Sequence, residues 1–363
     1  MSMDTRYKLA FWMAFMLFTA FVGTAQERMS KIVEKDFKLS NSGEVQIENK
    51  YGNIDVTGWE QDKVTIKVSI RVNHRKRENA ESLLSRINPE FKSGSNYVSV
   101  ISKISKKNTG WFADFFNKTN PVDFDKRHVQ IDYEIFLPRK AELRVTNRFG
   151  DVVIEGWSGP LNTLMEHGNL WVTEDLNKAD IILKFGKVRA QDLEYADLNL
   201  KNGDLEMENS SRLRLSSSGT EMDINSVKSL EIYSNKDDIL IGEIGSVNGS
   251  LKFSTLNMQR LIKEVNLDAK IADFRVTQFI ESESKISIEQ ESSEITLYVS
   301  GFSHKFSATL EQGVVRLPKS FENVNSTMLD KGRRLREIEA TYGNDQKGLI
   351  SINGIKGIVT INE

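Results

Sequence analysis

One short phrase recurs at nearly constant intervals through the middle of this chain. It contains a glycine each time, and the five glycines stand at positions 150, 168, 186, 203 and 219. The five dipeptides are Phe149-Gly150, His167-Gly168, Phe185-Gly186, Asn202-Gly203 and Ser218-Gly219. Two apolar residues, separated by one position, follow each glycine closely, as Val152 and Ile154 follow Gly150. A short fixed period is typical of repeat folds, and each glycine predicts a sharp turn before an extended segment.

The rhythm continues almost to Pro318, although other residues replace the glycine. Asp237-Asp238 takes its place in one unit, because aspartate also suits a tight turn. Further apolar pairs such as Leu198 and Leu200 lie between the turns, so each repeat supplies two short strands. Near-constant units with two strands favour winding, in which each coil rests on the last, over a flat meander of hairpins. We therefore expect an all-β chain whose residues 141–318 form a parallel β-helix, or β-solenoid, of ~17-residue coils.

Residues 27–140 are organised differently. The phrase occurs once early, at Asn49–Trp59, and returns almost unchanged at Asn147–Trp157. Between the copies, strict alternation over Val64–Val72 predicts a half-buried strand, and the composition of Arg75–Ile87 predicts a helix. We interpret residues 27–140 as a β-rich N-terminal module with one helix at about 75–87.

The C-terminal segment, 319–363, is expected to end the stack. Ser320–Arg336 is polar and predicts an irregular segment, whereas Gly348–Ile352 and Gly357–Ile361 return to the phrase. The ends of a repeat stack expose unpaired edges and a cut core, which need a cap. We expect the last two segments to be strands that close the final coil.

The N-terminal segment, 1–25, predicts a secretory signal peptide. Arg6 and Lys8 precede the apolar run Leu9–Val22, and small residues, Gly23 and Ala25, stand before the expected cleavage point. The run has about 14 residues, fewer than the ~20 that cross a bilayer, so we favour cleavage over a retained anchor. No later stretch approaches that length, and we expect an exported mature chain with no transmembrane span.

Composition excludes several classes of function. The chain has no cysteine, which excludes disulfides, thiolate metal sites and cysteine nucleophiles. Charged residues make up 28% of the chain and are of both signs, with a net charge of −2. This balance does not predict the basic surface that binding to nucleic acid requires. The outward position between the paired apolar residues carries no carboxylate cluster along the repeats. The four histidines, scattered without metal-ligand spacing, are His74, His128, His167 and His304. We predict no catalytic, metal or cofactor site.

A polar segment at 105–127 carries the most conspicuous aromatic residues. They are Trp111, Phe112, Phe115 and Phe116, with lysines on either side. Such a cluster could contact a partner or a membrane surface. Alternatively it folds back and plugs the end of the stack, which we favour because an end cap is a structural necessity.

Three tryptophans offer a second candidate surface. Trp59, Trp157 and Trp171 could form a stripe on which sugar rings stack. Trp59 and Trp157 each follow a turn glycine, however, and we expect them to pack over a corner.

The paired phrases Tyr51–Trp59 and Phe149–Val152 resemble a bacterial family of exported proteins labelled "putative adhesins", a domain of unknown function. The resemblance covers most of the mature chain and includes the signal peptide, the inserted strand-helix-strand segment and the glycine-anchored coils. It implies a β-solenoid in the cell envelope, and its motifs carry no catalytic residues.

We therefore expect a non-enzymatic protein of the periplasm or outer cell surface. Its elongated surface would bind a protein or glycan of the envelope or surface. Two alternatives stay open. One is a carbohydrate-active β-helix enzyme, a polysaccharide lyase or hydrolase, and the other, implied by the resemblance alone, is a periplasmic partner of an envelope signalling system.

Overall fold

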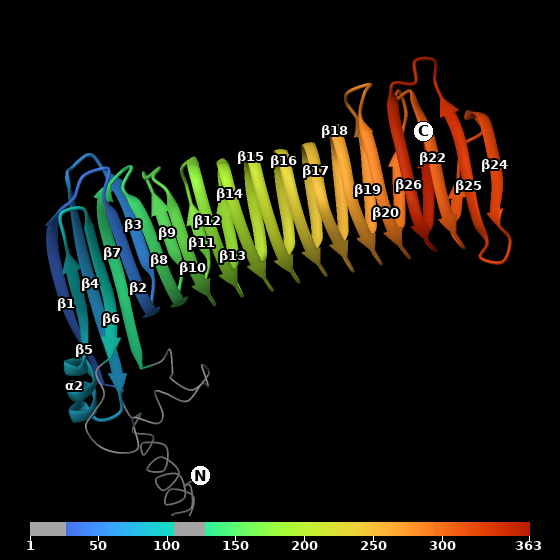
Figure 1. Ribbon diagram of the computed structural model, residues 1–363. Helices are drawn as coiled ribbons and strands as arrows, with labels where there is room; N and C mark the ends of the chain where they lie inside the picture. The colour runs from blue at the N-terminus through green and yellow to red at the C-terminus, as the bar shows by residue number, and fades with distance from the viewer. Residues whose placement is uncertain (1–26, 105–127) are drawn as a thin grey trace, which may run out of the picture. The chain divides into compact units, whose positions relative to one another are not determined.

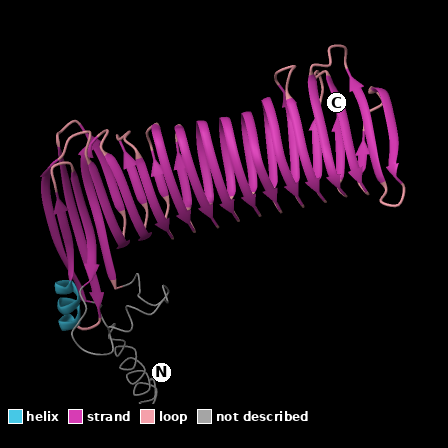
Figure 2. Cartoon of the chain, viewed as in Figure 1, coloured by secondary structure: helices cyan, strands magenta, loops and turns pink. Residues whose placement is uncertain are grey.

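The computed structural model describes residues 27–104 and 128–363 (Figure 1). The predicted signal peptide, together with Trp111, Phe112, Phe115 and Phe116, lies outside the described residues. Within the described ranges the chain is all-β with one helix, and its strands form a large, mostly parallel sheet that does not close (Figure 2). The expectation of an all-β chain is confirmed.

The chain divides into two compact units. The larger comprises Val33–Val68, Pro89–Ser102 and Ile131–Glu363, and the smaller takes in the described parts of Met1–Ile32, Ser69–Asn88 and Lys103–Gln130. Five strands have residues in both units, and they are β1 (Glu27–Lys38), β4 (Lys63–His74), β5 (Ile87–Ser93), β6 (Tyr97–Ile104) and β7 (Val129–Pro138).

The helix of the smaller unit, α2 (Arg77–Arg86), lies within the range expected from the sequence. Ala80 and Leu83 are its buried residues, three positions apart on one face. Arg77 pairs with Glu81 one turn later, their side chains 3.0 Å apart. The helix ends where Ile87 adopts an extended backbone and β5 (Ile87–Ser93) begins.

Two rows of paired strands, here called ladder A and ladder B, build the larger unit (Figure 1). In spatial order, ladder A contains β6 (Tyr97–Ile104), β2 (Glu44–Tyr51), β8 (Glu142–Phe149), β10 (Leu161–Glu166), β12 (Leu176–Lys184), β14 (Leu193–Lys201), the second halves of β15 (Asp204–Ser218), β16 (Glu221–Asn235), β17 (Asp238–Lys252) and β18 (Thr255–Lys270), then β20 (Lys285–Glu291), β26 (Gly348–Ile355), β22 (His304–Glu311), β25 (Leu335–Tyr342) and β24 (Glu322–Asp330).

Ladder B contains β7, β3 (Ile54–Trp59), β9 (Val152–Glu155), β11 (Leu170–Val172), β13 (Lys187–Ala190), the first halves of β15 to β18, β19 (Asp273–Phe279), β21 (Glu294–Tyr298), β27 (Ile358–Asn362) and β23 (Val314–Arg316). The four long strands β15 to β18 thus run through both ladders.

Through the middle of both ladders, neighbouring strands are parallel and their register equals the sequence period. Leu198 pairs with Leu215, and Leu215 pairs with Ile232, so each step from strand to strand is one repeat. All three are buried, while the residues that alternate with them are exposed or, at Glu231, half-buried. The two copies of the phrase also lie side by side, since Asn49 pairs with Asn147. Equivalent residues of successive repeats therefore form straight rows, either inside the core or along an outer face.

The turn glycines lie at the corners of the repeats, but they act there in two ways. Gly150 and Gly219 themselves have positive φ, of 141° and 66°. At Gly168 and Gly186 the left-handed backbone belongs instead to the residue before, with φ of 54° at His167 and 58° at Phe185. A Cβ added to Gly168 or Gly186 would lie 1.9 Å from the backbone oxygen of the glycine one repeat earlier. These glycines are thus required because successive corners approach too closely for a side chain.

The C-terminal strands are interleaved. β26 pairs with β20 on one side and with β22 on the other, so the tail lies inside ladder A rather than at its end. The segment expected to be irregular instead forms β24, antiparallel to β25. Every residue of β24 is exposed, so no apolar alternation marks it, and its backbone pairing alone defines the strand.

Candidate functional site

The tryptophans do not form a sugar-stacking stripe, so that interpretation of the sequence is wrong. Trp157 is completely buried, and its Nε1 donates to the carbonyl of Ala141 at 3.0 Å. Trp59 is half-buried and stacks on Phe136, with ring centroids 5.4 Å apart. Trp171 alone of the three is exposed, at 42%. Because its ring is buried, Trp157 is not accessible to a sugar.

His167 and His304 are packed against other side chains or the backbone. His167 lies at a corner of the repeats, its ring stacked between Phe149 and Phe185 at centroid distances of 5.2 and 4.8 Å. His304 is fully buried, and its Nδ1 lies 2.7 Å from the carbonyl oxygen of Phe302. Across residues 27–104 and 128–363, no group of three or more His, Asp or Glu side chains is placed to hold a metal ion.

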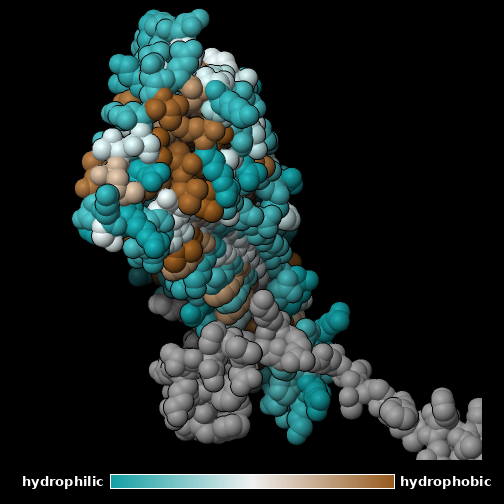
Figure 3. All heavy atoms as spheres, turned by 90° about the vertical axis from the view of Figure 1, so that its right-hand side faces the viewer, coloured by the Kyte–Doolittle hydropathy of each residue, from teal (hydrophilic) through white to brown (hydrophobic). Residues whose placement is uncertain are grey.

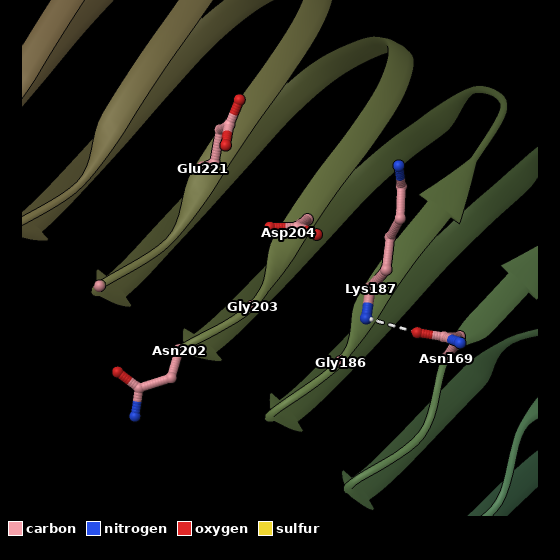
Figure 4. Close-up of a pocket in the computed structure, with 8 residues that line it drawn as sticks. Asn169, Gly186, Lys187, Asn202, Gly203, Asp204 and Glu221 are labelled. Atoms are coloured by element: carbon pink, nitrogen blue, oxygen red, sulfur yellow. Dashed lines mark hydrogen bonds between the residues drawn. The ribbon is translucent and has the colours of Figure 1, made fainter.

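The glycine corners leave a shallow hollow of about 460 Å³ on ladder B (Figure 4). Gly186, Gly203 and Gly219 line it, and at Gly186 and Gly203 the backbone one repeat earlier leaves no room for a side chain. Figure 4 shows Lys187 and Glu221 on strands either side of the one that carries Asp204, and the side chain of Asn169 accepts a hydrogen bond from the Lys187 amide at 3.0 Å.

Two carboxylate rows extend from this hollow along the outer face of ladder B. Asp204, Glu221 and Asp238 are register partners on β15, β16 and β17, and Glu206 pairs with Asp223 in the adjacent row. A second hollow of about 450 Å³ adjoins these rows. The prediction from the sequence was based only on the position between the apolar pairs. Three of the five carboxylates lie in the row just before those pairs, which was not predicted.

Cations balance part of this acidic face. The ammonium of Lys187 hydrogen-bonds to Glu206, and Arg189 Nε lies 3.1 Å from the same carboxylate. The hydrogen bond from Lys187 is the main cause that lowers the pKa of Glu206, with the charge of Arg189 assisting. Glu206 is therefore held in its ionised form.

A larger hollow, of about 650 Å³, lies on the outer face of ladder A. Tyr195 is 50% exposed there, and the Arg212 guanidinium lies 5.7 Å from the centre of its ring. Asp180, Asp197 and Arg214 form a row across β12, β14 and β15. These side chains stand one repeat apart in the sequence, so writing the repeats in columns would have aligned them.

A second exposed tyrosine adjoins this hollow. Tyr233, on β16, is 46% exposed and donates a hydrogen bond to Glu231 Oε1 at 2.9 Å. That bond and the charge of Glu231 raise the pKa of the Tyr233 hydroxyl. Glu231 also lies 3.7 Å from Arg214, which connects Tyr233 to the row of charged residues.

Apolar side chains gather at the C-terminal end of the larger unit (Figure 3). Exposed residues there include Val314 on β23, at 48%, and Val324 on β24, at 56%. The core beneath is closed by an aromatic cluster in which Phe321, 6% exposed, contacts His304 and Tyr342 at centroid distances of 5.5 and 5.2 Å. The end of the ladders thus has a cap of its own, and of its residues only His304 had been named from the sequence, as a scattered histidine and not as part of a cap.

In the described part of the chain, none of the helical structure is long and apolar enough to cross a membrane.

Comparison with known proteins finds likeness among solved structures. No family model and no curated protein matches the chain. "A putative cell adhesion protein" from Clostridium sporogenes is 11% identical, with 93% of this chain and 98% of that chain covered and a TM-score of 0.20. "A putative adhesin" from Parabacteroides merdae is 12% identical, with 72% and 92% covered and a TM-score of 0.35.

A "putative lipid binding protein" from Parabacteroides distasonis is 12% identical, with 72% and 93% covered and a TM-score of 0.33. With TM-scores below 0.5, none of these likenesses indicates what this chain binds. Two of these three structures are described as adhesion proteins or adhesins, and the third as a lipid binding protein.

Proposed function

We propose that this chain is a non-enzymatic, exported protein of the bacterial cell envelope, an adhesin-like β-solenoid that presents an extended binding surface. In this proposal, ladders A and B are two faces of one parallel coil. Parallel pairing in steps of one repeat supports it, as does the burial of alternate residues in both ladders.

The observation that carries the proposal is the arrangement of the outer faces. Side chains from successive strands stand in register, about 4.8 Å apart, as Asp204, Glu221 and Asp238 do. The hollows among them are open and shallow, whereas small-molecule sites enclose most of their ligand. Regular rows along an open face fit a long macromolecule better than a small substrate.

Cell fractionation tests the proposed localisation in the cell envelope, and a binding assay tests the proposed binding function. The full chain with a C-terminal epitope tag, expressed in a bacterium with an outer membrane, should appear in the periplasmic or outer-membrane fraction. The purified protein should bind isolated envelopes saturably. Retention in the cytoplasm, or no saturable binding, would contradict the proposal.

One alternative function has a specific observation in its favour. The carboxylates Asp204 and Glu221 beside Lys187 could act as acid, base and cation in a polysaccharide lyase or hydrolase. Turnover of a polysaccharide, abolished by Asp204→Asn or Glu221→Gln, would establish an enzyme and overturn the non-enzymatic proposal.

The aromatic segment keeps its two proposed roles. If Trp111, Phe112, Phe115 and Phe116 contact a partner, replacing Trp111 and Phe115 by Ser should abolish envelope binding without changing thermal stability. If they plug the stack, the same double variant should instead melt at a markedly lower temperature.

A further inference from the structure

We propose that the hollow on the outer face of ladder A binds a neutral polysaccharide chain. This inference rests on the proposed function, because it names the ligand class for one part of that binding surface. The hollow lies on strands β12, β14, β15, β16 and β17. The lining residues on which the proposal depends are Asp180, Tyr195, Asp197, Arg212, Arg214 and Glu231.

The charges in the hollow cancel. Its lining holds three carboxylates, and it holds three cations in Arg212, Arg214 and Lys178. A polyanion gains little from such a surface, because attraction to the cations is offset by repulsion from carboxylates on the same and neighbouring strands. The ligand it suits is uncharged.

The polar groups of the hollow match hydroxyl groups. Asp180 and Asp197 can only accept hydrogen bonds when ionised, while Arg212 and Arg214 can only donate them. A sugar hydroxyl both donates and accepts, so neighbouring hydroxyls can bond to an aspartate and an arginine together. A polymer of sugars offers such hydroxyls at regular intervals, as the strands offer these side chains.

The exposed tyrosines supply the apolar contacts that sugars need. The ring of Tyr195 is 50% exposed on an otherwise polar face, and the Arg212 guanidinium against it restrains its orientation. The C–H-rich face of a pyranose can stack on such a ring.

Tyr233 lies two strands further on than Tyr195, and four positions further along the strand direction. These offsets are roughly 10 Å and 13 Å, so the rings are roughly 16 Å apart, a span of several sugar units.

A protein partner fits the hollow less well. Protein interfaces depend on large side chains inserted into well-packed, desolvated pockets. Here the buried floor consists of Ala179, Ala196 and Leu213 beneath a shallow, charged surface. The lining of this hollow offers no deep apolar pocket for an anchor residue.

Affinity electrophoresis tests the proposal with the purified mature chain. Native gels would contain one neutral polysaccharide each: dextran, mannan, galactomannan or xyloglucan. At least one should retard the protein, and Tyr195→Ala should weaken that binding about tenfold or more, as expected for the loss of a central aromatic contact. Tyr195→Phe, which keeps the ring, should bind like the wild type. Tyr298→Ala serves as the matched control, since Tyr298 is 36% exposed but lies on ladder B.

Three outcomes would overturn the proposal: no neutral polysaccharide retards the wild type, only acidic polysaccharides such as alginate do so, or Tyr195→Ala binds as tightly as the wild type. Thermal melting of each variant shows whether it is folded, and Arg212→Ala provides a second test of the same hollow. If envelopes bind the wild type but no neutral polysaccharide does, this inference fails while the proposed function stands. If neither binds, the proposed function fails too.

Discussion

Replacing Gly186 by alanine tests how closely successive corners of the repeats approach. The added Cβ would lie 1.9 Å from the backbone oxygen of Gly168 and 2.8 Å from its carbonyl carbon. Contacts below 3.0 Å essentially never occur for real Cβ atoms, so the two backbones must separate by at least 3.0 − 1.9 = 1.1 Å. Because the obstacle is backbone, no side-chain rotation relieves the clash.

The energetic cost follows from what that movement disturbs. The Gly186 carbonyl accepts a hydrogen bond from the amide of Asp204 at 3.0 Å, and the Asn169 side chain holds the amide of Lys187 at 3.0 Å. Losing two hydrogen bonds costs about 2 kcal/mol, and forcing an extra carbon into a packed site costs about 1–3 kcal/mol. The lower entropy of the unfolded alanine chain offsets about 0.4–1 kcal/mol. We expect a net loss of about 2–5 kcal/mol.

Urea denaturation followed by circular dichroism measures this loss. Gly332→Ala is the matched control, because the nearest atom to its added Cβ is the side-chain oxygen of Asp330 at 3.3 Å. The control should change the free energy of unfolding by less than about 0.5 kcal/mol. If Gly186→Ala is equally neutral, the close approach of the corners is refuted.

Three further predictions concern stability. Ile271, a β-branched residue with φ of 49° and 49% exposure, should raise stability by about 1 kcal/mol when replaced by Asn, which tolerates this backbone. Asp237→Ala should lower it by about 3 kcal/mol, because this buried carboxylate accepts hydrogen bonds from the amide of Thr220 and the hydroxyls of Ser217 and Ser234. Burial lowers the pKa of His304, so only the unfolded chain takes up its proton just below pH 6.5, and stability should fall as the pH drops through that range.

Each of these has a control. Ile280→Asn, at a 47% exposed position without a left-handed backbone, should give no gain, and an equal gain would contradict the strain argument. Asp237→Asn should cost less than Asp237→Ala, since the amide oxygen still accepts hydrogen bonds. His304→Phe should remove part of the acid-side loss of stability, and an unchanged pH profile would show that His304 does not contribute to it.

The repeat period predicts much of the fold because it equals the register. Apolar residues such as Leu198 and Leu215 recur once in every repeat, and the structure stacks them in adjacent strands. The interleaving of β26 between β20 and β22 depends instead on pairing partners that are far apart in the sequence, such as Ile286 and Ile350. Local periodicity does not indicate which of two distant strands pair with each other, since all the strands carry the same apolar pattern.

The candidate surfaces were harder to predict for another reason. An outer row is visible in the sequence only when the repeats are aligned at the right offset, and each repeat has several outward positions. The position between the apolar pairs does not include Asp204, Glu221 and Asp238, which precede those pairs, or Tyr195, which lies on the other ladder. The role of Gly168, Gly186 and Gly203 was not predicted for a different reason, because close approach and a left-handed turn both favour glycine.

Cysteine cross-linking tests the parallel register most directly, because the chain has no cysteine of its own. Ser229 and Glu231 pair with Ser246 and Asn248, each one repeat later. Parallel neighbours on one face lie within reach of a disulfide. Two double variants, Ser229→Cys with Ser246→Cys and Glu231→Cys with Asn248→Cys, should therefore both cross-link on mild oxidation. An antiparallel hairpin that paired 229 with 246 would pair 231 with 244, so cross-linking of only one variant would contradict the stacked architecture.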